Sequence, residues 1–398
     1  MFSAPINAAA RSAGAPPLVQ KYGGSSLASV ERIHGVADRV AATHRAGRAL
    51  AVVVSAMGRR TDELLTLARS VSPTPHAREL DALLSTGEAV STALLAMALR
   101  DRGIDAVSLR GWQAEIRTEG RHGHARIADV SPQPVRAELA AGRVAVVTGY
   151  QGVGPDKTVT TLGRGGSDYS AVALAASLSA VRCEIYSDVE GVYSADPRVV
   201  PDARPIPHLG YDEMYAFSRQ GAKVLNADAV AAASDQRVIV YAGSTFGGHR
   251  FTVVGPTGRG PAVVGVTGRA SVFRLRGRPD DVERVAREHD EVGRCDRGED
   301  LEVVLKLRET TSAAELARAP LALEGPFASV AIVGRAVTSP SCRDTMRRTV
   351  GRRALTGTVY TGRCSLAMLV ANEDGAAAAR RLHAVFVDRP RASGEARA

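Results

Sequence analysis

One glycine-rich segment, Gly163-Arg164-Gly165-Gly166-Ser167-Asp168, sets a cation and a carboxylate among three glycines, just ahead of an apolar helical pattern that begins near Tyr169. Backbone N–H groups at such a turn, followed by a helix N-terminus, form a cradle for an anion. Arg164 suits a carboxylate or phosphate, and Asp168 suits an ammonium group. The segment predicts a site that binds both ends of an amino acid. The alternative is a tight turn in which Arg164 and Asp168 pair only with each other, because isolated glycine motifs often occur by chance.

A second candidate follows the short apolar run Leu18 to Tyr22, where the chain reads Lys21-Tyr22-Gly23-Gly24-Ser25-Ser26 before a helical pattern from about Val30 to His44. A strand, a Gly-Gly turn and a helix give phosphate-binding geometry, with the lysine as a point charge on phosphoryl oxygens. The sequence has no G-x-x-x-x-G-K-[ST] and no G-x-G-x-x-G, which excludes Walker-type and dinucleotide-binding loops. Only four of the 51 basic residues are lysines, so Lys21 and Lys223 are candidates for roles that an arginine fork cannot fill.

Three further side chains could do chemistry. Glu88 lies in a long helical pattern from Asp81 to Leu99, where a carboxylate is either solvated or directed into a pocket. His122 and His124 could be metal ligands, but they have no third ligand at useful spacing, so we expect them on a polar surface.

Composition excludes several classes of protein. The chain has 398 residues, 45% hydrophobic and 23% charged, which is typical of a globular protein with two or three domains. The net charge of +9 is interleaved with acidic residues, so a nucleic-acid partner is not expected. No apolar run approaches a membrane span, and residues 1–17 read as a disordered leader. The four cysteines lack C-x-x-C spacing, which indicates reduced thiols in a cytoplasmic protein.

Strand-like and helical patterns alternate along the first part of the chain and predict a largely parallel sheet covered on both faces. The strand-like runs are 18–22, 51–55, 144–150, 183–187 and 238–241. Ligands of such sheets bind outside the carboxyl ends of the strands, where this chain carries Lys21, Ser55, Gly152 and Asp188.

Prolines and glycines between 255 and 261 indicate a boundary, so we expect a domain over 18–258. Beyond it the patterns predict two small α+β modules, 262–325 and 326–390, and a disordered tail, 391–398. This half lacks paired carboxylates and strand-end lysines, which favours a binding or assembly role.

Seven ordered blocks between Leu18 and about Thr252 resemble the aspartate kinases of the amino-acid kinase fold. They read K-Y-G-G-S-S, V-V-V-S-A-M-G, L-L-S-T-G-E, T-G-Y-Q-G, T-T-L-G-R-G-G-S-D-Y, Y-S-D-V-E-G-V-Y-S-A-D-P-R and G-A-K-V-L. The resemblance implies a three-layer αβα sandwich followed by degenerate, ferredoxin-like ACT modules. It also implies a homodimer or higher homo-oligomer built through those modules.

The implied activity is ATP-dependent phosphorylation of the L-aspartate side-chain carboxylate to 4-phospho-L-aspartate, the first step toward lysine, threonine, methionine or a specialised metabolite. The resemblance implies that Lys21 and Asp168 are catalytic and that Ser55, Glu88, Arg164 and Asp168 surround aspartate. Mg²⁺ would be held mainly by the ATP phosphates, with no protein metal site. The implied ATP-binding residues are Lys21, Gly23, Gly24, Ser25, Ser187, Asp188, Tyr193, Arg198 and Lys223.

Two departures from the family pattern leave alternatives open. Asn226-Ala227-Asp228 stands where the family commonly has His-Pro, which favours a kinase for another amino-acid carboxylate. A non-catalytic amino-acid or nucleotide sensor is the other alternative. Ser339-Pro340-Ser341 replaces the Pro-Gly turn of an ACT module, and a helix start without that glycine offers fewer N–H groups to an effector. We therefore expect weak or absent feedback by lysine or threonine.

Overall fold

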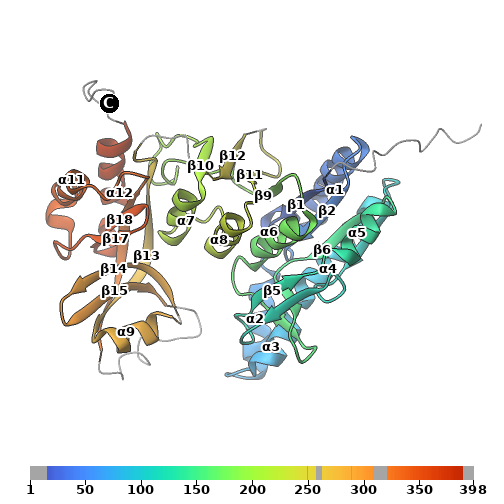
Figure 1. The fold of residues 1–398 in the computed structure, drawn as a ribbon, viewed down its shortest axis with the longest axis horizontal. Helices are drawn as coiled ribbons and strands as arrows, with labels where there is room; N and C mark the ends of the chain where they lie inside the picture. Colours follow the sequence, from blue (N-terminus) through green and yellow to red (C-terminus); the bar gives the residue numbers. More distant parts are fainter. Residues whose placement is uncertain (1–15, 249, 257–261, 288, 308–320, 389–398) are drawn as a thin grey trace, which may run out of the picture. The chain divides into compact units, whose positions relative to one another are not determined.

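The computed structural model describes residues 16–248, 250–256, 262–287, 289–307 and 321–388 (Figure 1). The predicted tail lies outside these residues, as does the predicted leader up to residue 15. The described chain forms two compact units, each built from two stretches. Of the described residues, those up to Glu190 and Asp228–Val253 form the first unit, and Gly191–Ala227 and those from Val254 onward form the second.

The first unit is built on a mainly parallel sheet with the strand order β12-β11-β9-β1-β2-β6-β3. The pairs β1–β2, β1–β9, β11–β9, β2–β6 and β3–β6 are all parallel. β1 and β2 are buried along their whole length, as expected of strands covered on both faces. The strands are β1 (Leu18–Tyr22), β2 (Leu50–Val54), β3 (Ala106–Leu109), β6 (Val144–Thr148), β9 (Cys183–Ser187), β11 (Val240–Ser244) and β12 (Phe251–Gly255).

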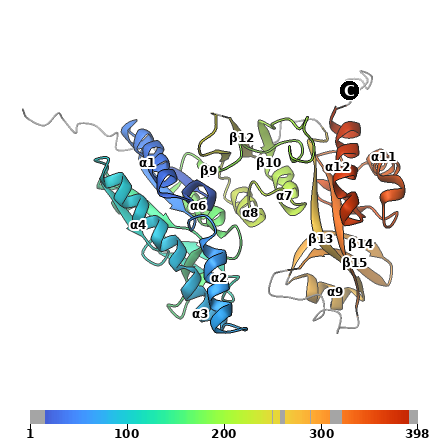
Figure 2. The ribbon, with the colours of Figure 1, turned by 180° about the vertical axis from the view of Figure 1, so that it is seen from behind.

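Helices cover both faces of this sheet, which makes three layers. Figure 2 shows α1 and α4 side by side on one face, and Figure 1 shows α5 and α6 on the other. Val36, Val40 and Leu95 are fully buried between the α1–α4 layer and the strands. The predicted αβα sandwich is therefore confirmed. The helices of this unit are η1 (Gly24–Leu27), α1 (Val30–Arg45), α2 (Arg60–Val71), α3 (Ala77–Leu84), α4 (Thr86–Arg100), α5 (Gln133–Ala140), α6 (Gly166–Leu178) and α8 (Ala227–Asp235).

The helix predicted over Asp81 to Leu99 is interrupted. α3 ends at Leu84 and α4 begins at Thr86, with Ser85 between them, so Glu88 lies in the first turn of α4. Taken together, Ala77–Arg100 has the length and apolar composition of a membrane span, which the sequence had not suggested. Its α4 part packs against α1, β3 and β6, and 56% of the apolar window is buried inside the protein, as in a core helix.

A smaller sheet with the strand order β5-β4-β7-β8 adjoins the end of β6 in the chain. Gly152, expected at the end of the 144–150 strand, lies inside β7 of this sheet, because β6 ends at Thr148. Gly149 takes the strand-end position in its place. The strands are β4 (Ile116–Glu119), β5 (Arg126–Val130), β7 (Gln151–Val153) and β8 (Val159–Thr161).

The second unit contains a closed barrel with the strand order β13-β15-β14-β17-β18-β16. β13 and β16 pair antiparallel along most of their length, so the two stretches predicted as separate modules share one barrel. The described strands are β10 (His208–Gly210), β13 (Gly265–Gly277), β14 (Asp290–Arg297), β15 (Asp300–Lys306), β16 (Ala322–Val333), β17 (Tyr360–Gly362) and β18 (Ser365–Val370).

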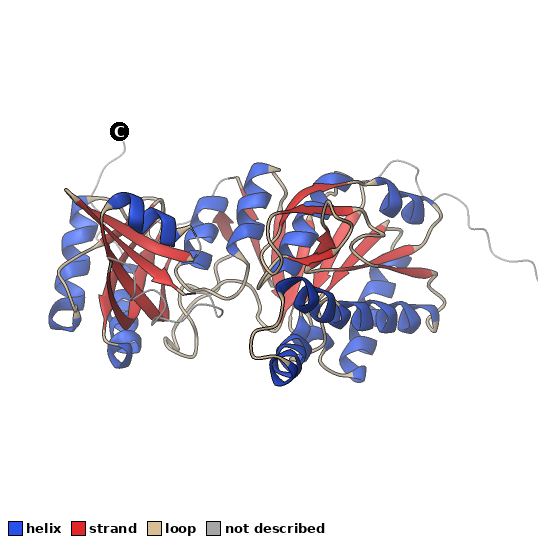
Figure 3. Cartoon of the chain, turned by 90° about the horizontal axis from the view of Figure 1, so that it is seen from below, coloured by secondary structure: helices blue, strands red, loops and turns tan. Residues whose placement is uncertain are grey.

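Helices surround this barrel, which Figure 3 shows as red strands flanked by blue helices. α11 and α12 pack on each other and enclose a core with Ile332, Met346 and Leu382. α7 packs against β14 and β16 of the same unit. The helices are α7 (Tyr211–Arg219), α9 (Pro279–Ala286), α11 (Pro340–Val350), η2 (Gly351–Arg353), η3 (Asn372–Asp374), α12 (Gly375–His383) and a closing π-helical turn (Ala384–Asp388).

Candidate active site

The carboxyl ends of four parallel strands meet at one edge of the first unit's sheet. Tyr22 is in register with both Val54 and Tyr186, and Val54 is in register with Thr148. The residues that follow, Gly23, Ser55, Gly149 and Asp188, therefore leave the sheet at the same edge. This is the place where open α/β sheets bind ligands.

A buried ion pair lies at the centre of that edge. Lys21 Nζ is 2.7 Å from Asp168 Oδ1, and the two side chains are only 10% and 9% exposed. Lys21 belongs to β1, between β2 and β9, while Asp168 lies in the first turn of α6, which packs on β1. The structure thus brings two of the predicted site residues, Lys21 and Asp168, into direct contact. The contact with Lys21 excludes the alternative in which Asp168 pairs only with Arg164.

The glycine turn after β1 packs tightly on the turn after β2. Gly58 N–H donates to the Gly24 carbonyl at 2.9 Å, and Ser55 N–H donates to the Tyr22 carbonyl at 3.1 Å. A Cβ atom on Gly24 would lie 2.8 Å from the Ala56 carbonyl oxygen, closer than real Cβ contacts come. Only glycine fits there, so the predicted residues Gly23, Gly24 and Ser25 are held beside Ser55.

Glu88 joins the same cluster from α4. Its side chain is buried, and Oε1 accepts a hydrogen bond from Ala56 N–H at 3.0 Å. Oε2 has no hydrogen-bond partner among the described residues. Burial, which penalises the charged form, raises the pKa of Glu88 to about 7. A buried carboxylate oxygen without a partner is costly, and a cationic group of a ligand would satisfy it.

Arg164 lies at the rim. Its side chain is 70% exposed, and Nη2 is 3.5 Å from Asp62 Oδ1 on α2. Gly163 and Gly165 on either side have φ angles of 77° and 74°, a left-handed conformation that favours glycine. The two glycines allow the chain to turn sharply into α6 and leave the guanidinium group accessible to a ligand carboxylate.

Asp81 has a structural role that the sequence did not reveal. Its buried carboxylate, on α3, pairs with His122 Nδ1 at 2.8 Å and accepts from Gly123 N–H at 3.0 Å. It also accepts from Thr161 N–H at 3.0 Å, close to the glycine-rich segment that begins at Gly163. His122 was expected on a polar surface, but it is half-buried and its ring contacts the Asp81 carboxylate. The sequence carried no signal for this contact, since the partners are 41 and 80 residues apart.

Tyr150 and Gly149 were also missed. Tyr150 is a non-glycine residue with a φ of 67°, and burial raises its pKa to about 12. The charges of Glu88 and Arg164 both act on its hydroxyl group. A Cβ atom on Gly149 would lie 2.7 Å from the Ser167 Cβ, so the strand end and α6 approach closely. A left-handed tyrosine beside a perturbed carboxyl group is typical of a functional site.

The remaining predicted nucleotide residues are divided between the units. Ser187 ends β9, where its Oγ accepts from Val189 N–H at 3.3 Å, and Asp188 is exposed beside it. Tyr193, Arg198 and Lys223 belong to the second unit. There Arg198 and Lys223 are exposed, and Arg198 Nη2 pairs with Asp196 Oδ2 at 2.7 Å.

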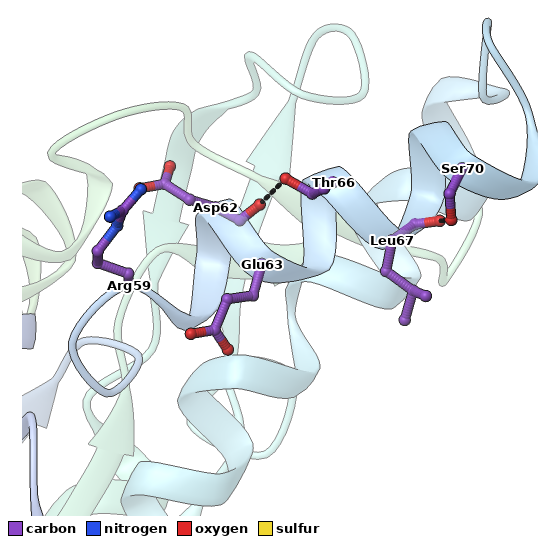
Figure 4. A pocket seen from close by; sticks show the side chains of 6 residues that line it. All are labelled: Arg59, Asp62, Glu63, Thr66, Leu67 and Ser70. Atoms are coloured by element: carbon purple, nitrogen blue, oxygen red, sulfur yellow. Dashed lines mark hydrogen bonds between the residues drawn. The ribbon is translucent and has the colours of Figure 1, made fainter.

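A separate open hollow of about 530 Å³ lies along α2 (Figure 4). Arg59, Asp62, Glu63, Thr66, Leu67 and Ser70 line it. Thr66 and Ser70 hydroxyls donate to carbonyls of their own helix, those of Asp62 and Leu67. No predicted site residue lines this hollow, so the strand-end cluster is the better candidate.

Comparison with known proteins places this cluster in context. A sequence model described as the amino acid kinase family matches residues 16–241. The aspartokinase of Corynebacterium glutamicum is 56% identical over 209 residues, which cover 52% of this chain and 50% of that protein. Aspartokinase 2 of Bacillus subtilis is 50% identical over 221 residues, covering 56% and 54%. The matched stretch thus spans about half the length of these curated relatives.

Solved structures match more of the chain. The structure of Escherichia coli aspartokinase III in complex with aspartate and ADP has a TM-score of 0.81, with 23% identity, and the match covers 93% of this chain and 99% of that one. The structure of aspartate kinase from Synechocystis is 33% identical with a TM-score of 0.56, covering 93% and 69%.

Proposed function

Because this chain belongs to the amino acid kinase family, we propose that it is an aspartate kinase, which transfers the γ-phosphoryl group of ATP to the side-chain carboxylate of L-aspartate. The product would be 4-phospho-L-aspartate. The family and the enzyme class rest on the matched sequence, while the substrates and the residue roles are our proposal.

One observation carries the proposal. Three charged side chains, Lys21, Asp168 and Glu88, converge on one edge of the sheet and are all buried. Burying charge is expensive unless a ligand or partner compensates it, so such a cluster is seldom merely structural. The stretch that contains it also has the high identity to aspartokinases.

Each charged side chain would bind the substrate group of opposite charge. Glu88 Oε2 would accept from the α-ammonium group of aspartate, and the exposed Arg164 would bind its α-carboxylate bidentately. Ser55 would hydrogen-bond the substrate beside them. The side-chain carboxylate of aspartate then forms a bond to the γ-phosphorus as the bond from that phosphorus to the bridging oxygen breaks, and ADP leaves with the electron pair. No general base is needed, since the nucleophile is already ionised.

Lys21 would neutralise charge on the transferred group, with Asp168 fixing its position. Catalysis of this kind is mainly positioning and electrostatic stabilisation. We propose that Mg²⁺ arrives bound to the ATP phosphates, where it would share in neutralising them. The nucleotide would contact Gly23, Gly24, Ser25, Ser187, Asp188, Tyr193, Arg198 and Lys223.

A second candidate keeps the chemistry and changes the acceptor. Asn226, directly before α8, stands in the stretch that departs from the family pattern. A kinase for another amino-acid carboxylate would therefore share Lys21 and Asp168 but differ in the preferred substrate. We expect in either case a cytoplasmic enzyme, in keeping with four free cysteines.

The decisive experiment is ATP turnover with Mg²⁺ and L-aspartate, with hydroxylamine present to trap an acyl phosphate as a hydroxamate. We expect an aspartate-dependent hydroxamate, and a turnover about two to three orders of magnitude lower in Lys21→Ala. Lys157→Ala is the matched control, because Lys157 is exposed in the turn between β7 and β8. Hydroxamate with another amino acid only would support the changed acceptor, and none with any amino acid would reject the kinase.

A further inference from the structure

The second unit contains a buried chain of hydrogen bonds between residues that lie far apart in sequence. Ser194 Oγ is 2.8 Å from His383 Nε2, and His383 Nδ1 is 2.9 Å from Asp388 Oδ2. His383 is fully buried and Ser194 is 3% exposed. His383 is the last residue of α12, Asp388 ends the turn that follows, and Ser194 lies next to Tyr193.

The direction of each hydrogen bond follows from the groups involved. Ser194 Oγ already accepts from Arg204 N–H at 2.9 Å, so its own hydrogen is available to donate. The Asp388 carboxylate can only accept, which places a ring hydrogen of His383 on Nδ1. In the tautomer with no hydrogen on Nε2, Ser194 O–H donates to that nitrogen. Ser194 Oγ, both ring nitrogens of His383 and Asp388 Oδ2 therefore have hydrogen-bond partners, and Asp388 Oδ1 lies 3.7 Å from Arg204 Nη2. A buried polar network whose groups are paired in this way stabilises one conformation.

Serine, histidine and aspartate in this order resemble the triad of a hydrolase. A nucleophile must meet its substrate, however, and here both Ser194 and His383 are buried. Arg204 N–H also occupies the Ser194 oxygen. The chain of bonds therefore holds a segment in place and does not attack a substrate.

The segment held in this way is the one that contains Tyr193 and Arg198. Ser194 N–H donates to the Arg204 carbonyl at 2.8 Å, and Val266 N–H, on β13, donates to the Ser194 carbonyl at 2.7 Å. His383, on α12, adds a side-chain hydrogen bond to Ser194 Oγ. The end of α12 and the first strand of the barrel thus fix one residue from two directions.

We propose that His383 is a positioning residue for the nucleotide, acting through Ser194 on Tyr193 and Arg198. The inference rests on the proposed function only in assigning Tyr193 and Arg198 to ATP. It predicts that His383 affects ATP binding and leaves aspartate binding unchanged, because the cluster of Glu88 and Arg164 lies in the other unit.

Substitutions at both ends of the Ser194–His383 bond test this. Ser194→Ala and His383→Ala should each raise the KM for ATP and the Kd for ADP about tenfold, with the KM for aspartate changed by less than about twofold. His383→Gln can place an amide near the position of Nε2 and should recover most of the ATP affinity. His383→Asn imitates Nδ1 instead and should not.

Leu382→Val is the matched control for lost stability, because Leu382 is fully buried on the same helix and packs in the unit's core. It should lower the melting temperature without moving the KM for ATP. If Ser194→Ala melts like the wild type and binds ADP equally well, the proposal is wrong. It is also wrong if Leu382→Val weakens ATP binding as much as His383→Ala does.

Direct measurement of ADP binding by calorimetry separates this proposal from the proposed function. A protein that binds ADP in a Ser194-dependent manner but phosphorylates no amino acid would refute the kinase and keep the positioning role. A wild-type protein that binds no nucleotide would refute both.

Discussion

At the scale of a single residue, the proposed role of Glu88 predicts that substrate binding depends on pH. Burial raises the pKa of this carboxyl group to about 7, and only the ionised form attracts an ammonium group. Lowering the pH through 7 therefore protonates Glu88, which should weaken aspartate binding. We expect the KM for aspartate to rise as the pH falls below about 7, approaching roughly tenfold per pH unit.

Glu88→Gln should raise the KM for aspartate at pH 8 and remove this pH dependence, since the amide does not titrate; initial rates across the range would measure both. Glu79→Gln is the control, because Glu79 is an exposed acid on α3 paired with Arg78. An unchanged pH profile in Glu88→Gln would assign the titration to another group.

We expect the Lys21–Asp168 pair to couple the stability of the protein to its activity. Lys21→Met leaves the Asp168 carboxylate buried without its partner cation, which should cost about 3–5 kcal/mol in the free energy of unfolding. Adding Asp168→Asn removes that charge and should restore most of the stability, while turnover stays low. Urea unfolding of the single and double variants measures the difference, and a double variant as unstable as Lys21→Met would contradict this account.

At the scale of elements, Asp81 joins α3 to β8 and to the loop at Gly123. Asp81→Asn replaces an oxygen acceptor by a donor that faces N–H groups, so it should lower the free energy of unfolding by about 1–3 kcal/mol. It should also raise the KM for aspartate, because Thr161 leads into the segment that carries Arg164. Thermal melts and initial rates measure both effects.

Asp129→Asn serves as the control, since Asp129 is exposed on β5, where its Oδ2 forms a long ion pair of 3.7 Å with Arg117 Nη1. An Asp81→Asn protein with the stability and KM of this control would show that the carboxylate is dispensable.

Local patterns predicted the elements that carry most of the site. The strand 18–22 and the strand 183–187 lie where the sequence placed them, and both are largely buried and followed by a glycine or a polar residue. The contact of Lys21 with Asp168 could be expected from strand-end topology and from the family motifs together. These motifs are local in sequence, so periodicity and spacing reveal them.

Contacts between residues far apart in the chain could not be predicted from local sequence patterns. The helix breaks at Ser85, which places Glu88 in the first turn of α4. No proline or glycine stands at Ser85 to predict this break. Asp81 and His122 meet across 41 residues, and Ser194 and His383 across 189. Gly149 replaced Gly152 at a strand end because the apolar run did not reveal where β6 stops.

At the scale of the whole molecule, we expect the second unit to respond only weakly to amino-acid effectors. α11 begins at Pro340, which has no N–H group, and Cys342 N–H already donates to Ser339 Oγ at 3.3 Å. Few donors are left at this helix start for the carboxylate of an amino-acid effector. We expect millimolar lysine or threonine to reduce turnover by less than about twofold, whereas a tenfold reduction would require about 90% occupancy of an inhibitory site.

Inhibition assays with each amino acid, alone and together, measure this. Calorimetry with lysine on the same protein is the control for silent binding. Strong inhibition by either amino acid would show that the effector is bound without the Pro-Gly turn.

The barrel of the second unit is closed unevenly. β16 and β18 are joined by pairs from Ala328–Val370 to Val333–Ser365, whereas β14 and β17 share the single pair Arg294–Thr361. A barrel hides every strand edge from other molecules only while it stays shut. We expect the pairing of β14 with β17 at Thr361 to open first, so the amide protons of β17 should exchange with solvent well before those of β18. The two strand edges exposed by this opening could pair with strands of other molecules. The rate at which the purified protein aggregates on storage should therefore depend on the Arg294–Thr361 pair.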